Sequence, residues 1–446
     1  MTSFNKLPPE LFGELAKFMP SRDLKNLSCT SKLIRDNLIH ILFTNLAITC
    51  PLASDKGLDA FINKWGGLVS RVHLHLRLIP NTSDEDDIII PSLWGTPPSQ
   101  MLKKIVQGQL LPHIDTLSVR FDPEQFESTG SWDGDGWWGD PSDLGTIYTF
   151  EESEDQERTL QQEAEFIWRA QYTEFFKDVS ANQNIRHFTI SNLLPRNSSV
   201  WETQEWKTFL GRLEEFDVSV FGGDNGAGWR ANSLPGFAEF IESLPNYFMQ
   251  HATNVVRLRI EAHPWGLFGC AGDCGIRLPL RSDNFPSLRS LTLKNVLIGI
   301  ELIEFLMSHG DGLKELTMVD CMCVEGWPRD ATPAWANLWQ TLRVDCSNIS
   351  KVSVVRTQTP PLAHMEGFEG YEPSPDSESA SKIRKMLKED ESLVLWRYVA
   401  VNTKYGMVFE VEERNILCFE AGEDQKEYSM LLDVIRERNK NTLIES

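Results

Sequence analysis

A spacing of apolar residues recurs along most of the chain. Each instance reads apolar-x-x-apolar-x-apolar, and its last positions alternate with polar residues, as a half-buried strand requires. The pattern occurs at Val69/Val72/Leu74, Ile114/Leu117/Val119, Ile185/Phe188/Ile190, Leu213/Phe216/Val218, Val255/Leu258/Ile260, Leu288/Leu291/Leu293, Leu313/Leu316/Met318 and Ile349/Val352/Val354. We therefore expect a short strand at each of these places, with one face buried.

Helix-like segments lie between these strands, at residues 58–65, 101–110, 161–179, 203–213, 237–251, 300–309 and 334–342. A strand followed by a helix, repeated, is typical of leucine-rich repeats, in which each unit leaves an apolar face that its neighbour covers. The instances start between 25 and 71 residues apart, so the period is not constant. The pattern favours an irregular leucine-rich-repeat-like array, and an ordinary α/β domain is the alternative.

The N-terminal stretch has a helical pattern of its own. One helical face, which ends at Pro20, consists of Leu7, Leu11, Leu15 and Phe18. Ser21 is a candidate N-cap of a second helix, and Thr30 or Ser31 of a third that carries Ile34, Leu38 and Ile41 inward. Three short helices cannot bury this much leucine among themselves. We therefore expect this unit to pack on a partner, either the rest of the chain or another protein.

The same stretch resembles the F-box, in the form found in fungal proteins. The residues that carry the resemblance are, in chain order, Leu7-Pro8-Pro9-Glu10-Leu11, Asp23-Leu24, Leu27, Cys29, Lys32 and Arg35. The chain departs from many F-boxes at Leu33-Ile34, where those have a Trp after the Lys. A generic three-helix bundle or a helix-turn-helix is the alternative. A net charge of −21 disfavours the helix-turn-helix, because DNA affinity depends on Lys and Arg contacts to phosphate.

These patterns divide the chain into an F-box (residues 1–48), an array (52–356), a linker (357–381) and a C-terminal cap (382–446). Within the array, residues 122–165 are an acidic insertion rich in Gly and Trp, which we expect to form a surface loop. For the cap we expect a helix at 380–389, a hairpin of strands at 393–401 and 407–413, and an amphipathic helix at 424–439. The expected fold class is therefore mixed α/β, with a small α+β cap over the open end of the array.

Composition limits the compartment and the partners. No run of eighteen apolar residues is present, so we expect no membrane span, and the polar N-terminus lacks the apolar core of a signal peptide. We therefore expect the eight cysteines to be reduced and the protein to be cytoplasmic, nuclear or both. The strongly acidic balance argues against nucleic acid and anionic membrane as the main partners.

No catalytic, metal or cofactor site is expected from the motifs. Asp133, Asp135 and Asp140 lack the spacing and the closing Glu of an EF-hand. The loop 222–228 has neither the spacing nor the Lys of a phosphate-binding loop, so we expect its glycines only to turn the backbone. Cys270 and Cys274 near His263, and Cys321 with Cys323, lack a second ligand pair at zinc spacing.

The F-box resemblance implies a non-catalytic substrate receptor. The F-box would dock on the Skp-type adaptor, and through it on the cullin, of an SCF-type ubiquitin ligase, while the array captures a protein substrate. Carried over onto this chain, the adaptor-binding residues would be Leu7, Pro8, Leu11, Leu15, Leu24, Leu27, Cys29 and Ile34. Two alternatives stay open: an F-box scaffold that engages no cullin, and a repeat protein whose N-terminal helices only cap the array.

The capture surface follows from the strand pattern. In a repeat array, the polar positions of each strand line the concave face. The candidate substrate-binding residues at these positions are Arg71, His73, Arg120, His187, Arg257, Arg259, Lys294 and Lys351. With Glu215, Asp217, Glu261 and Glu315 as the acidic residues of this face, its balance is mildly basic. We therefore expect an acidic or phosphorylated substrate element; the alternative is that these are merely solvated strand residues.

Overall fold

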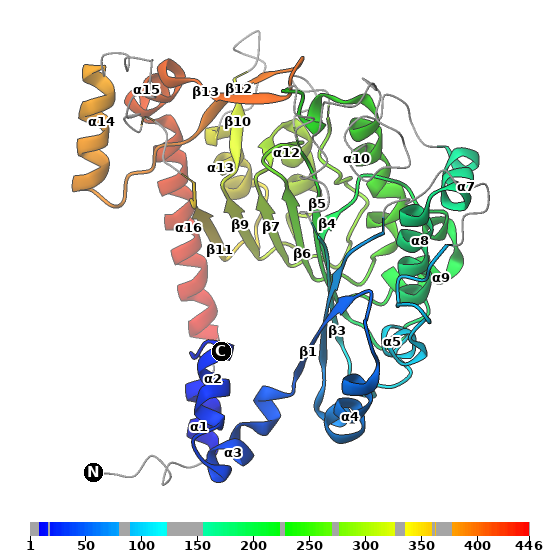
Figure 1. The fold of residues 1–446 in the computed structure, drawn as a ribbon. Helices are drawn as coiled ribbons and strands as arrows, with labels where there is room; N and C mark the ends of the chain where they lie inside the picture. Colours follow the sequence, from blue (N-terminus) through cyan, green and yellow to red (C-terminus); the bar gives the residue numbers. More distant parts are fainter. Residues whose placement is uncertain are drawn as a thin grey trace, which may run out of the picture.

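The computed structural model describes residues 9–16, 18–79, 90–122, 155–223, 228–269, 276–325, 335–358, 362 and 377–445. Its centre is a parallel sheet in which each strand pairs with its neighbours in chain order (Figure 1). The strands are β1 (Asn45–Cys50), β2 (Arg71–Leu76), β3 (Thr116–Phe121), β4 (His187–Leu193), β5 (Glu215–Val220), β6 (Arg257–Ala262), β7 (Ser290–Lys294), β9 (Glu315–Val319) and β11 (Lys351–Val355). Each strand expected from the apolar spacing is therefore present, and β1 is an addition.

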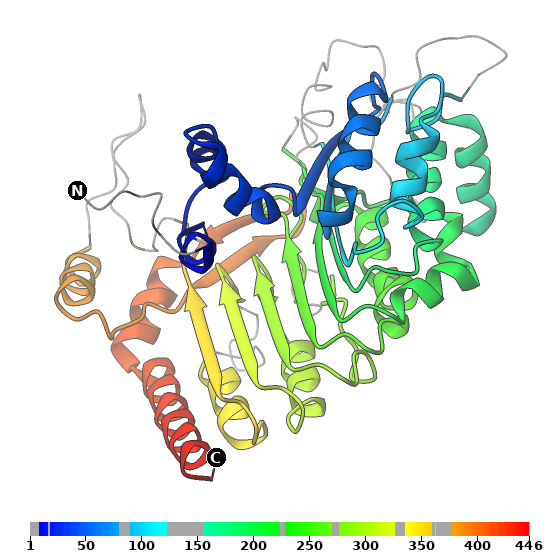
Figure 2. The ribbon, with the colours of Figure 1, turned by 90° about the horizontal axis from the view of Figure 1, so that it is seen from below.

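Helices connect successive strands and cover one face of the sheet. They are α4 (Lys56–Trp65), α5 (Gln100–Val106), α7 (Gln156–Glu165), α8 (Ile167–Ser180), α9 (Gln204–Leu210), α10 (Pro235–Tyr247), α12 (Ile300–Ser308) and α13 (Trp335–Val344), with 3-10 turns η2 (Gly66–Leu68), η4 (Ser199–Glu202), η5 (Ala231–Ser233) and η6 (Met249–His251). Figure 2 shows the sheet curving, with these helices along its outer side. The structure is thus mixed α/β with a mostly parallel sheet.

One expected helix and one expected loop need correction. The single helix expected at 161–179 is two helices, α7 and α8, because the backbone at Phe166 is extended. Asp155 starts α7 by accepting a hydrogen bond from the Arg158 N–H, which is the usual role of an N-cap carboxylate. The end of the expected acidic loop is therefore helical, and the part of that insertion at residues 123–154 lies outside the described residues.

The apolar core lies between the sheet and its helices. Alternate residues of each strand point into it, as β2 shows with buried Val72, Leu74 and Leu76 against exposed Arg71 and His73. The helices contribute several large aromatic side chains that are almost completely buried, namely Trp168, Phe175, Phe176, Trp201, Trp206 and Phe209. The other face of the sheet is therefore left to the polar side chains.

Left-handed backbone occurs at an irregularity within β4 and directly after β7 and β9. Asn192, Asn295 and Asp320 have φ angles of 58°, 54° and 51°, and each lies two residues after the last apolar position of its strand pattern. Asn and Asp tolerate this conformation better than other non-glycine residues. The Asn192 amide donates to the Phe121 carbonyl at 3.0 Å, and that of Asn295 donates to the Ala262 carbonyl at 3.1 Å. The side chains of Asn192 and Asn295 thus join neighbouring strands of the sheet near their ends.

The N-terminal helices form a separate unit below the sheet (Figure 1). They are α1 (Pro9–Ala16), α2 (Ser21–Ser28) and α3 (Lys32–Leu42). Ser31 caps α3 by accepting from the Ile34 N–H at 3.2 Å, as expected, whereas Pro20 rather than Ser21 occupies the N-cap position of α2. The unit ends at Leu42, and β1 already belongs to the sheet, so the expected boundary at residue 48 lies too late.

The C-terminal region folds over one end of the array. Its parts are α14 (Glu378–Glu389), α15 (Glu412–Ala421), α16 (Glu423–Glu445) and a second sheet with strand order β13-β12-β10-β8, made of β13 (Met407–Glu410), β12 (Tyr398–Asn402), β10 (Met322–Val324) and β8 (Leu297–Ile298). The hairpin and two of the helices lie close to where they were expected, whereas α15 and the pairing with β10 are additions. The helix α14 begins inside the expected linker, of which residues 359–361 and 363–376 lie outside the described ones.

Across the described ranges, every helix is either too short or too polar to span a lipid bilayer.

Candidate functional site

The N-terminal unit has its own small core. Ala16, Leu24, Ile34 and Leu38 are buried together, and this cluster is separate from the core of the array. Leu24 and Ile34 were expected to bind the adaptor, but they are only 8% and 4% exposed. We therefore reassign both residues to the core of the unit, since their side chains present almost no surface to a partner.

Several large apolar side chains of this unit are exposed. Leu11 and Leu15 on α1 are 47% and 43% exposed, Phe18 just after α1 is 85% exposed and Leu33 at the start of α3 is 52% exposed. Scattered exposed leucines are normal on protein surfaces. This set is notable because it sits on about 35 residues whose own core is very small. The exposed apolar side chains are therefore the best candidate for a protein-docking surface.

The remaining adaptor-binding candidates are distributed as follows. Leu27 is half-buried against the small core, and Cys29 is exposed. Leu7 and Pro8 lie outside the described residues. Phe18 shares the helical spacing of Leu11 and Leu15, so the sequence already contained the signal for it. No helical pattern in the sequence pointed to Leu33. This residue lies in the first turn of α3, and its exposure follows from how the three helices pack.

The inner face of the sheet carries the candidate substrate-binding residues in rows. The strands are in register, so that Arg71, Thr116, His187, Glu215, Arg257, Ser290, Glu315 and Lys351 form one row across the sheet. A second row runs from His73 through Asp217 and Arg259 to Ser353, and a third contains Arg120, Glu261 and Lys294. The fold therefore brings all eight candidates onto one face.

Most of these cations already have a carboxylate partner. Glu215 pairs with Arg257, its neighbour on β6, and lies 3.4 Å from His187. Glu261 accepts from Arg259 at 2.9 Å and from Lys294 at 2.7 Å. A weaker contact of 3.9 Å joins Lys351 to Glu315 at the far edge. In the middle of the inner face the cations and carboxylates therefore neutralise one another, and the expected mildly basic balance is not found there.

Burial shifts several pKa values on this face. Glu261 loses solvation, but hydrogen bonds from Lys294 and Arg259 outweigh that effect and lower its pKa. Burial raises the pKa of Asp217, although Arg259 opposes the shift. Burial, together with the charge of Arg71, lowers the pKa of His73, which contacts Asn45 at 3.4 Å. At neutral pH, His73 is therefore a neutral polar group rather than a second cation beside Arg71.

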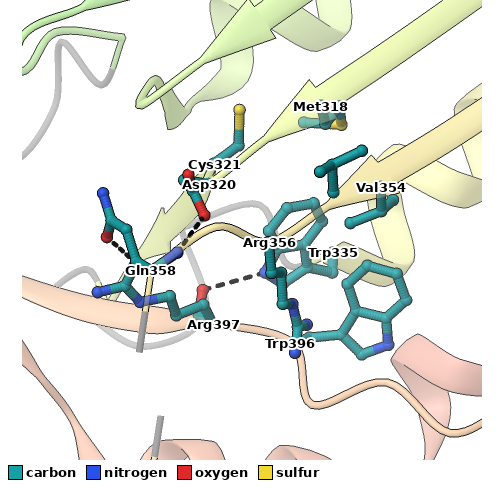
Figure 3. A pocket seen from close by; sticks show the side chains of 10 residues that line it. Met318, Asp320, Cys321, Trp335, Val354, Arg356, Gln358, Trp396 and Arg397 are labelled. Carbon is teal, nitrogen blue, oxygen red and sulfur yellow. Dashed lines mark hydrogen bonds between the residues drawn. The ribbon is translucent and has the colours of Figure 1, made fainter. Parts of the chain in front are cut away.

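A small pocket lies where β9 and β11 end (Figure 3). Trp335 and Trp396 form its apolar wall, with ring centroids 5.0 Å apart. On the polar side, Asp320 accepts from the Thr357 N–H at 2.7 Å, and the Gln358 side chain accepts from Arg397 at 2.8 Å. These hydrogen bonds tie the array to the C-terminal region. The pocket is thus a structural junction whose polar groups are engaged with one another.

Within the described parts of the chain, the buried thiols and the possible metal ligands add no further site. Burial raises the pKa of Cys321, beside the pocket, to about 12 and that of Cys346 to about 11. Both thiols are therefore protonated at neutral pH, and the thiolate is the reactive form. Among the described residues, His, Cys, Asp and Glu form no cluster of three that could hold a metal ion. Cys270 and Cys274, like Asp133, Asp135 and Asp140, lie outside the described residues.

In comparisons with known proteins, no family model matches this chain, and no curated protein sequence matches it either.

Proposed function

We propose that this chain is the substrate receptor of an SCF-type ubiquitin ligase, with an F-box-like N-terminal unit that docks on a Skp-type adaptor. The observation that carries the proposal is the exposed apolar set Leu11, Leu15, Phe18 and Leu33 on a helical unit with a separate core. It agrees with the F-box-like order of residues between Leu7 and Arg35. The curved array beside it offers a polar inner face for a protein substrate.

The separate core favours docking over capping. A capping unit would bury its apolar face on the open end of the array, yet among the described residues Ala16, Leu24, Ile34 and Leu38 cluster with residues of their own unit. The buried side chains of β1 belong instead to the main core, on which Phe61 and Ile62 of α4 also pack. An apolar surface left exposed in this way suits a partner protein.

The proposed contribution of the chain is proximity rather than covalent chemistry. A receptor holds the substrate near a ubiquitin-conjugating enzyme bound elsewhere in the ligase, which raises the effective concentration of a substrate lysine. The receptor would act in the cytoplasm, the nucleus or both, where such ligases work. No cofactor is needed for this role.

The test is a pull-down of the full-length chain that probes for the adaptor and for the cullin. Leu15→Glu combined with Phe18→Glu places two charges on the exposed apolar set without touching the small core. Met307→Glu combined with Val344→Glu is the matched control, because these side chains are 53% and 60% exposed on α12 and α13. We expect the wild type and the control to recover both partners and the first variant to recover neither.

The same experiment separates the alternatives. Recovery of the adaptor without the cullin would favour a scaffold outside the ligase. Recovery of neither partner by folded wild-type protein would contradict the proposal and favour a repeat protein with an unrelated N-terminal unit. Circular dichroism of each variant shows whether it is folded, so that a loss of binding is not mistaken for a loss of structure.

A further inference from the structure

The charges of the inner face cancel everywhere except at one end. Arg257, Arg259, Lys294 and Lys351 all contact Glu215, Glu261 or Glu315. The exception is the end formed by β2 and β3. There, Arg77 just beyond β2 pairs with Asp122 just beyond β3 at 3.0 Å. Arg71 and Arg120 are the cations of this face that have no ion pair with a described residue. Both side chains are exposed.

The two arginines lie on neighbouring strands and are offset from each other along the strand direction. Arg120 on β3 lies opposite His75 on β2, and Arg71 lies four residues before His75. Four residues of a strand span about 13 Å, so the two guanidinium groups emerge about that far apart along the strand direction. The side chains between them on this face include uncharged Thr116 and Ser118, and His73, whose pKa is lowered. Next to Arg120, the Asp122 carboxylate is already paired with Arg77 at 3.0 Å and lies 3.8 Å from His75. The site is therefore two separated arginines without an ion pair to a described residue, with polar side chains between them.

We propose that Arg71 and Arg120 anchor an extended acidic segment of the captured protein, with two carboxylate or phosphoryl groups about four residues apart. This inference rests on the proposed function, because it names the substrate element that the receptor would hold. A guanidinium binds either anion through two parallel hydrogen bonds. The distance of about 13 Å between the arginines matches that between side chains i and i+4 of an extended segment, which lie on the same face.

The charge of the whole chain makes the site selective. A net charge of −21 repels acidic partners at a distance. Local attraction at Arg71 and Arg120 then decides where such a segment can rest. The central network, in which each cation already faces a carboxylate, offers no comparable attraction because a newcomer would have to displace an existing pair.

The experiment measures binding of fluorescent ten-residue peptides of Gly and Ser to the full-length chain by anisotropy. One peptide carries two Glu four residues apart, a second carries phosphoserine at the same positions, and a third carries Gln there. We expect the first two to bind and the third not to bind. The ratio of the first two affinities shows whether the arginines take carboxylates or phosphoryl groups, and binding of either one supports the proposal.

Two double variants locate the site. Arg71→Gln with Arg120→Gln is expected to weaken binding at least about tenfold, equivalent to about 1.4 kcal/mol. Lys104→Gln with Lys314→Gln makes the same change in net charge at exposed positions on the helical side and before β9, and is expected to change binding less than about twofold. Equal losses in both variants, or an unchanged affinity in the first, would overturn the proposal.

Two further readouts keep the inference distinct from the proposed function. The variant with Gln at positions 71 and 120 should still recover the adaptor, because neither arginine lies on α1–α3. If wild type binds the peptides but recovers no adaptor, the ligase proposal fails and the acidic-segment site stands. If the peptides bind only after deletion of residues 128–150, the arginines serve the chain's own acidic segment and the inference is wrong.

Discussion

The ring of Phe43 lies flat against the indole of Trp65, with centroids 4.4 Å apart and planes inclined by 7°. Phe43 is the C-cap residue of α3, and Trp65 ends α4. The edge of Phe61 adds a contact to the same Phe43 ring at 5.8 Å. This stack joins the N-terminal unit to the first helix of the array, and it does so between two otherwise separate cores.

Loosening this stack should free the joint without unfolding either part. Phe43→Ala removes an aromatic pair worth about 1 kcal/mol beyond its buried area. We expect faster limited proteolysis at residues 42–45 and an unchanged melting temperature of the array. Phe409→Ala is the control, since Phe409 is 52% exposed on β13. Equal cleavage rates in the wild type and in Phe43→Ala would show that other contacts hold the joint.

The two cores should respond separately to cavities. Leu38 and Leu306 are both completely buried, one in the N-terminal unit and the other in the array. Replacing a buried Leu with Ala costs about 2–5 kcal/mol. Leu38→Ala should therefore remove hydrogen-exchange protection in α1–α3 only, and Leu306→Ala should lower protection across the array. A loss of protection in both parts from Leu38→Ala would show that the two cores fold as one.

Acid should weaken the fold through His263. Burial lowers the pKa of this side chain to about 4, although Glu261 opposes the shift. The unfolded chain binds the proton more tightly, so the stabilisation is complete above about pH 6.5 and is lost as the pH falls toward about 4. The partial exposure of the ring limits the effect to about 1–3 kcal/mol.

The measurement for His263 is the free energy of unfolding at pH 7 and at pH 4.5 in the wild type and in His263→Asn. The Asn carbonyl can still accept the hydrogen bond that the Trp265 N–H donates to Nδ1 at 3.2 Å. We expect a smaller loss between the two pH values in the variant. Parallel pH profiles would mean that His263 does not contribute to the acid sensitivity.

Gly222 should tolerate no side chain. A Cβ atom there would lie 2.8 Å from the backbone of Gly266 and 3.0 Å from the Cβ of His263. Gly222→Ala should therefore destabilise the array by about 1–3 kcal/mol, as overpacking does. Gly67→Ala is the matched control, because its Cβ would meet nothing within 4 Å. Chemical denaturation of both variants gives the comparison, and similar midpoints would refute the close-approach explanation.

The C-terminal helix should depend on Asp424. Its carboxylate accepts from the Ala336 N–H and from the Tyr398 hydroxyl, each at 2.9 Å, and so joins α16 to α13 and β12. Asp424→Ala leaves both donors without this acceptor and should cost about 2–3 kcal/mol. Glu423→Ala, one residue earlier and exposed, should have little effect. Urea denaturation of the two variants distinguishes these outcomes.

Local patterns predicted the elements of the array well. The apolar spacing located the strands from β2 to β11 because the alternation of buried and exposed residues is a property of the strand itself. The same patterns missed β8 and β10, which have two and three residues and are buried throughout. They also missed the role of Gly222, which was expected to turn the backbone. Its need for glycine comes from a residue 44 positions away.

The candidate surfaces were predicted only in part, because exposure and ion pairing also depend on residues that are distant in the sequence. The sequence by itself determined which side chains face inward along each strand, and it placed Leu11, Leu15 and Phe18 on one helical face. The helical pattern already turned Ile34 inward, but only the tertiary structure decided that Leu24 and Ile34 are too buried to contact a partner, since that depends on how α1–α3 pack. It also decided which cations of the inner face are neutralised. Arg257 and Arg71 are alike in sequence, but the register places Glu215 beside the first and Thr116 beside the second.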